Sequence, residues 1–115
     1  MSPLAEIAVE RHGTRVVARV AGEVDVTNVG VVGNQLVAAV PNDALGLVID
    51  LDATTYLDSA AIELLFDLSR RLQRRRQDLR LVVPDGSPLT RVLELTEVHT
   101  AAPLHGTLSG ALSEG

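Results

Sequence analysis

Residues 45–76 read LGLVIDLDATTYLDSAAIELLFDLSRRLQRRR, a short apolar run followed by a long amphipathic pattern. The run at 45–51 is nearly all apolar, which is typical of a strand that is covered on both faces of a parallel sheet. From about Ser59 to Arg76, apolar side chains recur every three or four residues, as on one face of a helix: Ala61, Leu64, Leu65, Leu68 and Leu72. The stretch therefore predicts a buried parallel strand followed by a long helix.

The order of acidic and basic residues along the predicted helix matches the direction of the helix dipole. Glu63 and Asp67 lie early in the helix, whereas five of the ten arginines lie between residues 70 and 76. The helix dipole favours acids near the N-terminus and bases near the C-terminus. Asp67 and Arg71 are four residues apart, so we expect them to form an ion pair on the helix surface.

Strand patterns on both sides extend this unit. Two β-branched runs, at 5–11 and 14–20, flank His12-Gly13 and predict an antiparallel hairpin with one core-facing side. A second apolar run at 79–83 predicts another strand. Residues 98–102 predict a last short strand.

Helix signals lie between these strands. Apolar residues at helical spacing over 29–40 predict a helix with Thr27 as its N-cap. Ser87 is expected to cap a helix over 88–95, because proline is favoured at the first helical position. Residues 107–112 predict either a short final helix or a frayed tail.

Strands that alternate with helices imply parallel crossover connections. The predicted fold is therefore α/β, a mixed β-sheet with an N-terminal antiparallel hairpin and a parallel remainder, covered by about four α-helices. The length of 115 residues fits a single domain over 1–115, with its core at about 5–103.

Composition excludes several classes of function. The chain has no cysteine, which removes disulfides, cysteine zinc sites and thiol nucleophiles. All ten basic residues are arginine, so the lysine of a P-loop or of a Schiff base is absent. A net charge of −5, one Tyr, one Phe and no Trp argue against a nucleic-acid partner.

The sequence predicts a protein without a membrane partner. Its first residues lack the basic and apolar regions of a signal peptide, and no apolar run reaches membrane-spanning length. We therefore expect a cytoplasmic location.

The junction at Asp58-Ser59 is the clearest candidate site. A serine at a helix N-terminus, after a strand, is either an ordinary N-cap or a hydroxyl beside backbone N–H groups that favour an anion. Between Val20 and Ser69 the chain has eight acids and no arginine. Such a region is either a solvated face or a surface that meets a basic partner.

Enzymatic functions fit the residues poorly. Ser59 lacks the glycines of a G-x-S-x-G nucleophile elbow, and the three histidines have no metal-ligand spacing. A phosphoacceptor receiver domain would need an acid pair after its first strand and a late lysine, both absent. The glycines Gly30 and Gly33 lie within a helix pattern and form no dinucleotide-binding motif. We expect no enzyme, no metal site and no cofactor.

Two stretches resemble the STAS domain, in particular the single-domain bacterial anti-sigma factor antagonists. Residues 20–25, VAGEVD, resemble the G-E-hydrophobic-D loop of this family. Residues 50–59, DLDATTYLDS, resemble its D-L-x₅-hydrophobic-D-S stretch. The resemblance extends from the N-terminal hairpin to the third predicted helix.

The resemblance implies a regulator that switches partners. In the family, the serine after the second Asp is phosphorylated by an anti-sigma factor that is also a GHKL-type serine kinase, which implies Ser59 here. Dephosphorylation would fall to a PP2C-type phosphatase. The unmodified form is expected to bind the anti-sigma factor and free a sigma factor, through these residues: Glu23, Asp25, Thr27, Asp58, Ala60, Ala61 and Ile62.

Some questions stay open at this level. The family usually has Gly where this chain has Ala61, a methyl group that affects partner choice if a partner backbone approaches there. Thr54 and Thr55 are alternative phosphoacceptors, and the oligomeric state is open. A second hypothesis is a STAS scaffold subunit, for example of a lipid-transport ATPase, in which Ser59 is only a helix cap. A nucleotide-sensing or non-phosphorylatable STAS module is a third.

Overall fold

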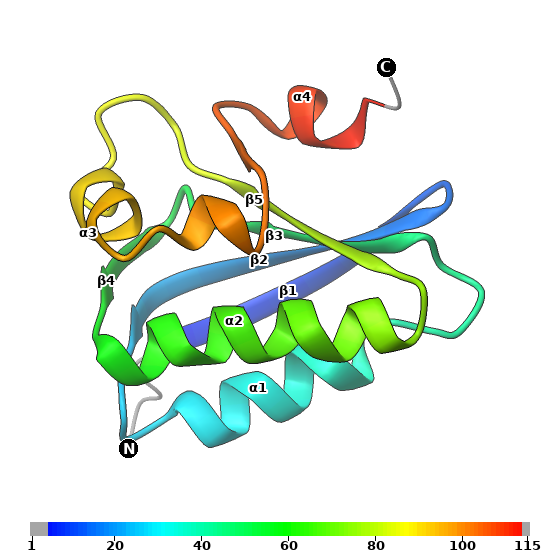
Figure 1. Cartoon of the computed structure of the whole chain (residues 1–115), viewed down its shortest axis with the longest axis horizontal. Helices are drawn as coiled ribbons and strands as arrows, with labels where there is room; N and C mark the ends of the chain where they lie inside the picture. Colours follow the sequence, from blue (N-terminus) through cyan, green and yellow to red (C-terminus); the bar gives the residue numbers. More distant parts are fainter. Residues whose placement is uncertain (1–4, 114–115) are drawn as a thin grey trace.

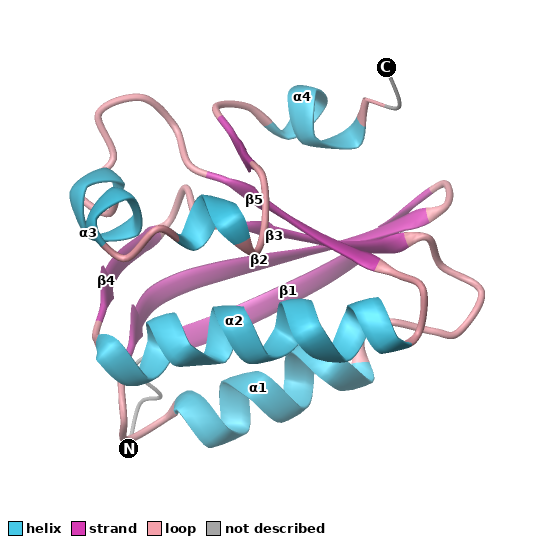
Figure 2. Ribbon diagram, viewed as in Figure 1, coloured by secondary structure: helices cyan, strands magenta, loops and turns pink. Residues whose placement is uncertain are grey.

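The computed structural model describes residues 5–113, which form a mixed sheet with helices on both faces (Figures 1 and 2). The strand order is β1-β2-β3-β5-β6, and β4 pairs with β2 beyond the end of β3. Only β1 and β2 are antiparallel; the other pairings are parallel. The predicted fold class is confirmed. The strands are β1 Ala5–His12, β2 Arg15–Val24, β3 Gly46–Asp50, β4 Thr54–Leu57, β5 Asp78–Val82 and β6 Leu104–His105.

The helices divide between the two faces. Helices α1 (Val29–Ala38) and α2 (Ser59–Arg74) lie side by side along one face, and α4 (Leu108–Leu112) lies across the sheet from them (Figure 1). Helix α3 (Thr90–Leu95) and the 3₁₀ helix η1 (Val98–Thr100) contribute buried side chains to the same core as α1 and α2. The core is therefore asymmetric, with most helices on one side.

Alternation along the strands separates two apolar clusters. In β2, Val16, Ala18 and Val20 point into the larger cluster under α1 and α2, while Val17 points into a smaller one under α4. In β3, Leu47 and Ile49 join the first cluster and Val48 joins the second. All five residues of β3 are buried, as expected for a central parallel strand. Helix α4 is thus a docked element, which resolves the two predictions for residues 107–112.

Strand β4 is an element that the sequence did not predict. Its outer residues are buried and its middle ones exposed, and the buried Thr54 hydroxyl donates a 2.6 Å hydrogen bond to the Val20 carbonyl of β2. The register between β2 and β4 shifts at Gly22 and Glu23, where Gly22 has a φ of 99°. As a result, β2 pairs with β3 along its first half and with β4 along its end.

Other expectations are corrected. Residues 98–102 hold the 3₁₀ helix η1, and the last strand is β6 instead. Asp67 pairs with Arg70, three residues away, and not with Arg71. Residue Asn28, rather than Thr27, occupies the N-cap position of α1.

Ser87 also differs from its expected role. Its hydroxyl accepts a hydrogen bond from the Leu89 N–H at 3.1 Å, but α3 begins only at Thr90. Serine therefore closes the turn that leads into the helix.

Gly46 has a specific packing role in β3. It lies between Arg15 of β2 and Asp78 of β5 in the sheet register, and these two side chains form an ion pair. Arg15 is only 4% exposed. A Cβ at position 46 would overlap both the carbonyl oxygen and the carboxylate of Asp78 and would lie 2.9 Å from Arg15 Nη1. The missing side chain lets the buried guanidinium reach its carboxylate.

We expect Gly46→Ala to lower the free energy of unfolding by about 2–3 kcal/mol, because overpacking against backbone forces the strands apart. Gly30→Ala is the matched control, since a Cβ there meets nothing within 4 Å. It should stabilise α1 by about 0.5–1 kcal/mol. Urea denaturation followed by circular dichroism measures both; equal stability of the two variants would contradict this role of Gly46.

Candidate functional site

The two sequence motifs meet because β2 and β4 are parallel and end together. Val24 is opposite Leu57 in the register, and the Asp58 N–H donates to the Val24 carbonyl at 3.3 Å. The turn at 25–28 follows β2, and helix α2 follows β4 directly. The C-terminal ends of neighbouring parallel strands are a common place for binding sites.

The Asp58 carboxylate joins the two segments. One oxygen accepts a hydrogen bond from the Ala61 N–H at 3.0 Å and so caps α2. The other oxygen accepts from the Val26 N–H at 2.9 Å, in the turn after β2. One side chain therefore fixes the start of α2 relative to the turn.

The turn itself is closed by its own side chains. The Asp25 carboxylate accepts hydrogen bonds from both the N–H and the hydroxyl of Thr27. The Asn28 side chain accepts from the Asp25 N–H at 2.9 Å and donates to the Glu23 carbonyl at 2.9 Å. The hydrogen bond from the Thr27 hydroxyl is the main cause that lowers the pKa of Asp25 below its ordinary value. Desolvation opposes this lowering, and the N–H groups of Thr27 and Asn28 add smaller contributions to it.

Ser59 is the first residue of α2, exposed at the surface. The capping role belongs to Asp58, so of the two interpretations of Ser59 the one in which it is the N-cap is wrong. Within residues 5–113, the Ser59 hydroxyl has no hydrogen-bond partner. Its oxygen is therefore available to solvent or to another molecule.

The two threonines before this site differ in access. Thr54 is 2% exposed, and its hydroxyl is occupied by the Val20 carbonyl. Thr55 is exposed on β4. Burial thus removes Thr54 as an alternative phosphoacceptor in the folded protein and leaves Thr55.

The structure brings most of the predicted partner-binding residues to one surface. Glu23, Thr27 and Ser59 are exposed, and Asp25, Asp58 and Ala60 are partly exposed. Two others do not belong to that surface: Ala61 is 2% and Ile62 is 6% exposed, both packed in the main core.

The burial of Ala61 bears on the glycine that the family usually has at this position. The Ala61 side chain lines a very small apolar space inside the core, together with Val24, Val32, Leu36 and Leu57. Its methyl group therefore faces the sheet and α1, away from any partner.

Sequence reasoning missed two exposed apolar residues on the segments that lead into the site. Val26, in the turn, is 71% exposed, and Tyr56, in β4, is 51% exposed. Tyr56 is opposite Glu23 in the register between β4 and β2. The sequence carried no signal for the exposure of Tyr56, since this exposure depends on strand β4, which the sequence did not predict.

The negative charge of this surface is not neutralised within the described chain. Among the eight acids between Val20 and Ser69, Asp43, Asp50 and Asp67 pair with Arg11, Arg19 and Arg70. None of the ion pairs found within residues 5–113 involves the other acids, among them Glu23, Asp25, Asp58 and Glu63.

A shallow groove continues the surface between α1 and α2. Its volume is about 260 Å³. Gly30, Ala60 and Leu64 lie along it, and Glu63 and Asp67 of α2 form its acidic side. The site is thus an acidic, partly apolar surface with a free hydroxyl.

The described part of the chain has neither a cluster of metal-ligating side chains nor a membrane-spanning helix. In residues 5–113, no group of three or more histidine and acidic side chains is placed to hold a metal ion. None of the helices there has the length and apolar character needed to cross a bilayer.

Replacing Asp58 tests its bridging role. We expect Asp58→Ala to lower the free energy of unfolding by about 1–2 kcal/mol, the usual effect of losing an N-cap. Hydrogen exchange should accelerate at the Ala61 and Val26 amides together. The exposed Asp52, whose carboxylate has no partner in the described residues, provides the control Asp52→Ala. Unchanged exchange at Val26 in the Asp58 variant would contradict the bridge.

Thr27→Val tests the closed turn separately. Loss of the hydroxyl should raise the pKa of Asp25 toward its ordinary value, because the largest stabilising contact of the ionised carboxylate is gone. A group with a lowered pKa contributes stability above its unfolded pKa and loses that contribution as the pH falls through its folded pKa. The free energy of unfolding of the variant should therefore depend less on pH between the folded and unfolded pKa values of Asp25. Carbon-13 NMR titration of the Asp25 carboxyl measures the shift, and an unchanged titration curve argues against this bond.

Comparison with known proteins agrees with this architecture. The family model of the STAS domain matches residues 6–111. An anti-sigma factor antagonist from Mycobacterium paratuberculosis is 28% identical, with a TM-score of 0.82 over 94% of this chain and 91% of that chain. A putative anti-sigma factor antagonist from Thermotoga maritima is 16% identical, with a TM-score of 0.78 over 92% and 91%.

SpoIIAA, described as an anti-sigma factor antagonist, has the same fold in its unphosphorylated form: 17% identity and a TM-score of 0.71 over 93% of each chain. No curated protein sequence matches this chain significantly. The family match covers the sheet, the helices and the site described above. The chain belongs to the STAS family.

Proposed function

We propose that this protein is an anti-sigma factor antagonist whose binding is switched by phosphorylation of Ser59. In the unphosphorylated form it binds an anti-sigma factor, which is also a GHKL-type serine kinase, and so frees a sigma factor. Phosphorylation of Ser59 ends the binding, and a PP2C-type phosphatase restores it. The observation that carries the proposal is the exposed Ser59 hydroxyl, free of hydrogen bonds within the described chain, on a braced acidic surface.

The surface around Ser59 has the composition of a protein interface. Exposed Val26 and Tyr56 supply apolar area, and tyrosine is among the residues that contribute most to binding when they become buried. Glu23, Asp25, Asp58 and Glu63 surround them with negative charge that no arginine pairs within residues 5–113. A partner with a complementary basic surface would be steered to this end of the sheet.

The bracing of the site favours a preformed interface. Asp58 fixes α2 to the turn, and Asp25 and Asn28 close the turn from within. A rigid surface loses little conformational entropy on binding. Ser59 is therefore presented to a kinase or a binding partner in a fixed position.

A phosphate on Ser59 would act on binding and leave the fold intact. It adds about −1.5 to −2 charges at neutral pH. The N-terminus of α2 tolerates this charge, because the helix dipole favours anions there. In the interface, however, the phosphate lies next to Asp58 and adds size and charge to a surface that was shaped without it. Desolvation and repulsion then oppose docking.

The solved relatives support this reading. SpoIIAA of Bacillus has been solved in a phosphorylated as well as an unphosphorylated form, and its phosphorylated form has the fold of this chain with a TM-score of 0.63. On this proposal the protein carries out no catalysis of its own. It is a cytoplasmic regulator of transcription that acts by exchanging partners and contacts no nucleic acid.

Substitutions at Ser59 test the proposal. The tagged protein, Ser59→Ala and Ser59→Glu are used to capture partners from the cytosol of the source organism. Wild type and Ser59→Ala should capture a GHKL-type kinase, and Ser59→Glu should bind the purified kinase about tenfold or more weakly, because it places a fixed negative charge in the interface. With ATP, the kinase should add one phosphate to wild type, detected by intact mass, and none to Ser59→Ala.

Thr55→Glu is the matched control, because Thr55 is also exposed and lies only four residues away. It should bind the kinase like wild type. Equal binding of Ser59→Glu, or phosphorylation that persists in Ser59→Ala, refutes the switch. Capture of transporter subunits, unaffected by Ser59→Glu, would instead support the scaffold role.

A further inference from the structure

A second surface, separate from Ser59, lies along the outer edge of β1. This strand pairs with β2 on one side, and no strand of the described chain pairs with its other side. His12 and Arg15 flank a two-residue turn, where Gly13 has a φ of 63°. In such a hairpin the two residues that flank the turn are hydrogen-bonded to each other. Going away from the turn, pairs that are hydrogen-bonded across the two strands then alternate with pairs that are not. Accordingly, Ile7 and Val9 direct their N–H and C=O groups to the open edge.

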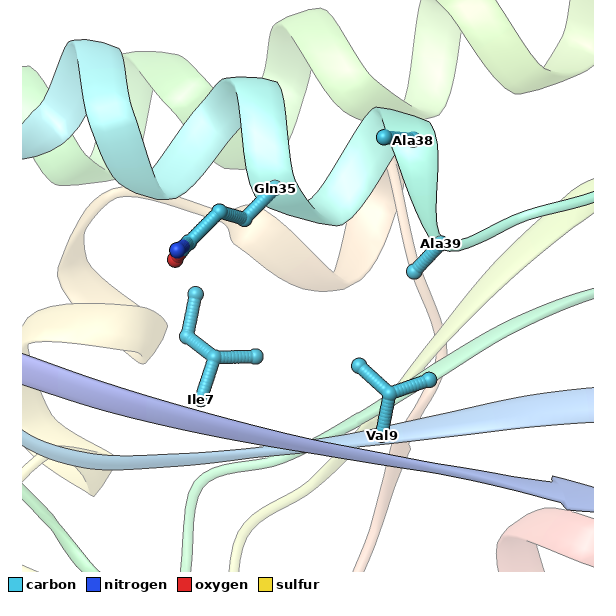
Figure 3. A pocket seen from close by; sticks show the side chains of 5 residues that line it. All are labelled: Ile7, Val9, Gln35, Ala38 and Ala39. Atoms are coloured by element: carbon cyan, nitrogen blue, oxygen red, sulfur yellow. The ribbon is translucent and has the colours of Figure 1, made fainter.

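An apolar groove lies beside this edge, between β1 and the C-terminal half of α1. Its volume is about 360 Å³. Figure 3 shows Ile7 and Val9 rising from β1 toward Gln35, Ala38 and Ala39 of the helix region, with an open space between them. Val9 is 48% exposed, although it lies on the core-facing side of the strand. The small side chains at positions 38 and 39 leave this side of the sheet incompletely covered.

The opposite face of β1 is acidic along the same stretch of the strand. Glu6, Ala8 and Glu10 alternate with Ile7 and Val9 and are all exposed. Glu10 contacts His12 at 3.1 Å. Arg19, on the neighbouring strand, is paired with Asp50, so its charge is engaged elsewhere. An added strand would therefore meet apolar side chains on one face and carboxylates on the other.

We infer that the β1 edge binds an extended segment of another protein in which apolar and basic residues alternate. The backbone of that segment would pair with the open N–H and C=O groups of β1, as in other cases of strand addition. Its apolar side chains would enter the groove under α1, and its basic side chains would lie beside Glu6 and Glu10. Cross-strand pairs of opposite charge are favourable, and like charges directly opposite are not.

The same charges disfavour a second copy of this chain as the occupant. A two-fold antiparallel pairing that fills both grooves would place Ile7 opposite Val9 of the copy. In that register Glu6 is opposite Glu10 twice, once on each side of the axis. Charged residues on an edge strand commonly prevent such self-pairing. The acidic face of β1 therefore favours a basic partner and disfavours self-association in this register.

Two synthetic peptides of alternating sequence test the inference: Val-Arg repeated three times and Val-Glu repeated three times. Each is titrated into the full chain labelled with nitrogen-15. The Val-Arg peptide should shift amide signals of β1 and of residues 35–39, and leave those of Ser59 and Ala60 unchanged. It should bind about tenfold or more tightly than the Val-Glu peptide, since two cross-strand pairs change from repulsive to attractive.

Substitutions in β1 separate the backbone and charge contributions. Val9→Pro removes one N–H from the open edge without removing a bond to β2, a position where proline is tolerated. It should reduce binding about tenfold or more, whereas Val9→Thr, which keeps the N–H and the branched shape, should stay within about threefold of wild type. The double variant Glu6→Lys/Glu10→Lys should reverse the order of the two peptides, and this arm stays informative even if Val9→Pro impairs folding.

The proposal is overturned by equal affinity for the two peptides, by shifts centred on Ser59, or by unchanged binding in a folded Val9→Pro variant. Sedimentation of the unliganded protein provides one further test, which measures whether the chain forms a dimer. A dimer that dissociates in Val9→Pro but not in Val9→Thr would assign the edge to a second copy and also overturn the proposal. None of these outcomes depends on the phosphorylation of Ser59, so the two proposals fail independently.

Discussion

The carboxylate of Asp58 is the contact on which the site depends. It accepts one N–H from the first turn of α2 and one from the turn after β2, two segments more than thirty residues apart in the sequence. This bridge is possible only because β2 and β4 are parallel neighbours that end at the same level. The short strand β4, held by the Thr54 hydroxyl, is thus what brings the two motifs together. Ser59 is positioned by its neighbour, and its hydroxyl makes no hydrogen bond within the described chain.

The fold could be predicted where apolar periodicity is long. Helix α2 and strands β3 and β5 follow from regular patterns of leucine, isoleucine and valine. Strand β4 could not be found this way, because it has four residues, two of them exposed, and its main anchor is a side-chain hydrogen bond to β2. The small strand β6 has only two residues, which is too short for any pattern.

The candidate site could likewise be predicted from the sequence only in part. Aspartate and serine are both good N-caps, so the sequence Asp58-Ser59 does not reveal which of them caps α2. The structure assigns the cap to Asp58 because its second oxygen also meets the Val26 N–H, a contact between distant residues. Ala61 and Ile62 were expected at the interface, but helical geometry turns them into the core. Exposure of Val26 and Tyr56 likewise depends on tertiary structure.

The placement of the arginines explains why the site keeps its negative charge. Arg15 and Arg80 both pair with Asp78 on the sheet, and Arg80 also donates to the carbonyls of Ala111 and Ser113 that end α4. Arg75 donates to the Val40 carbonyl and the Asn42 side chain, which ties the end of α2 to the loop after α1.

These cations hold distant elements in place, and no ion pair of the described chain joins an arginine to Asp25 or Asp58. Phosphate groups order a segment when they meet an arginine cluster of the same chain. With the paired arginines engaged elsewhere, a phosphate at Ser59 would act mainly at the surface of a partner, as the proposed switch of binding without a change of fold requires.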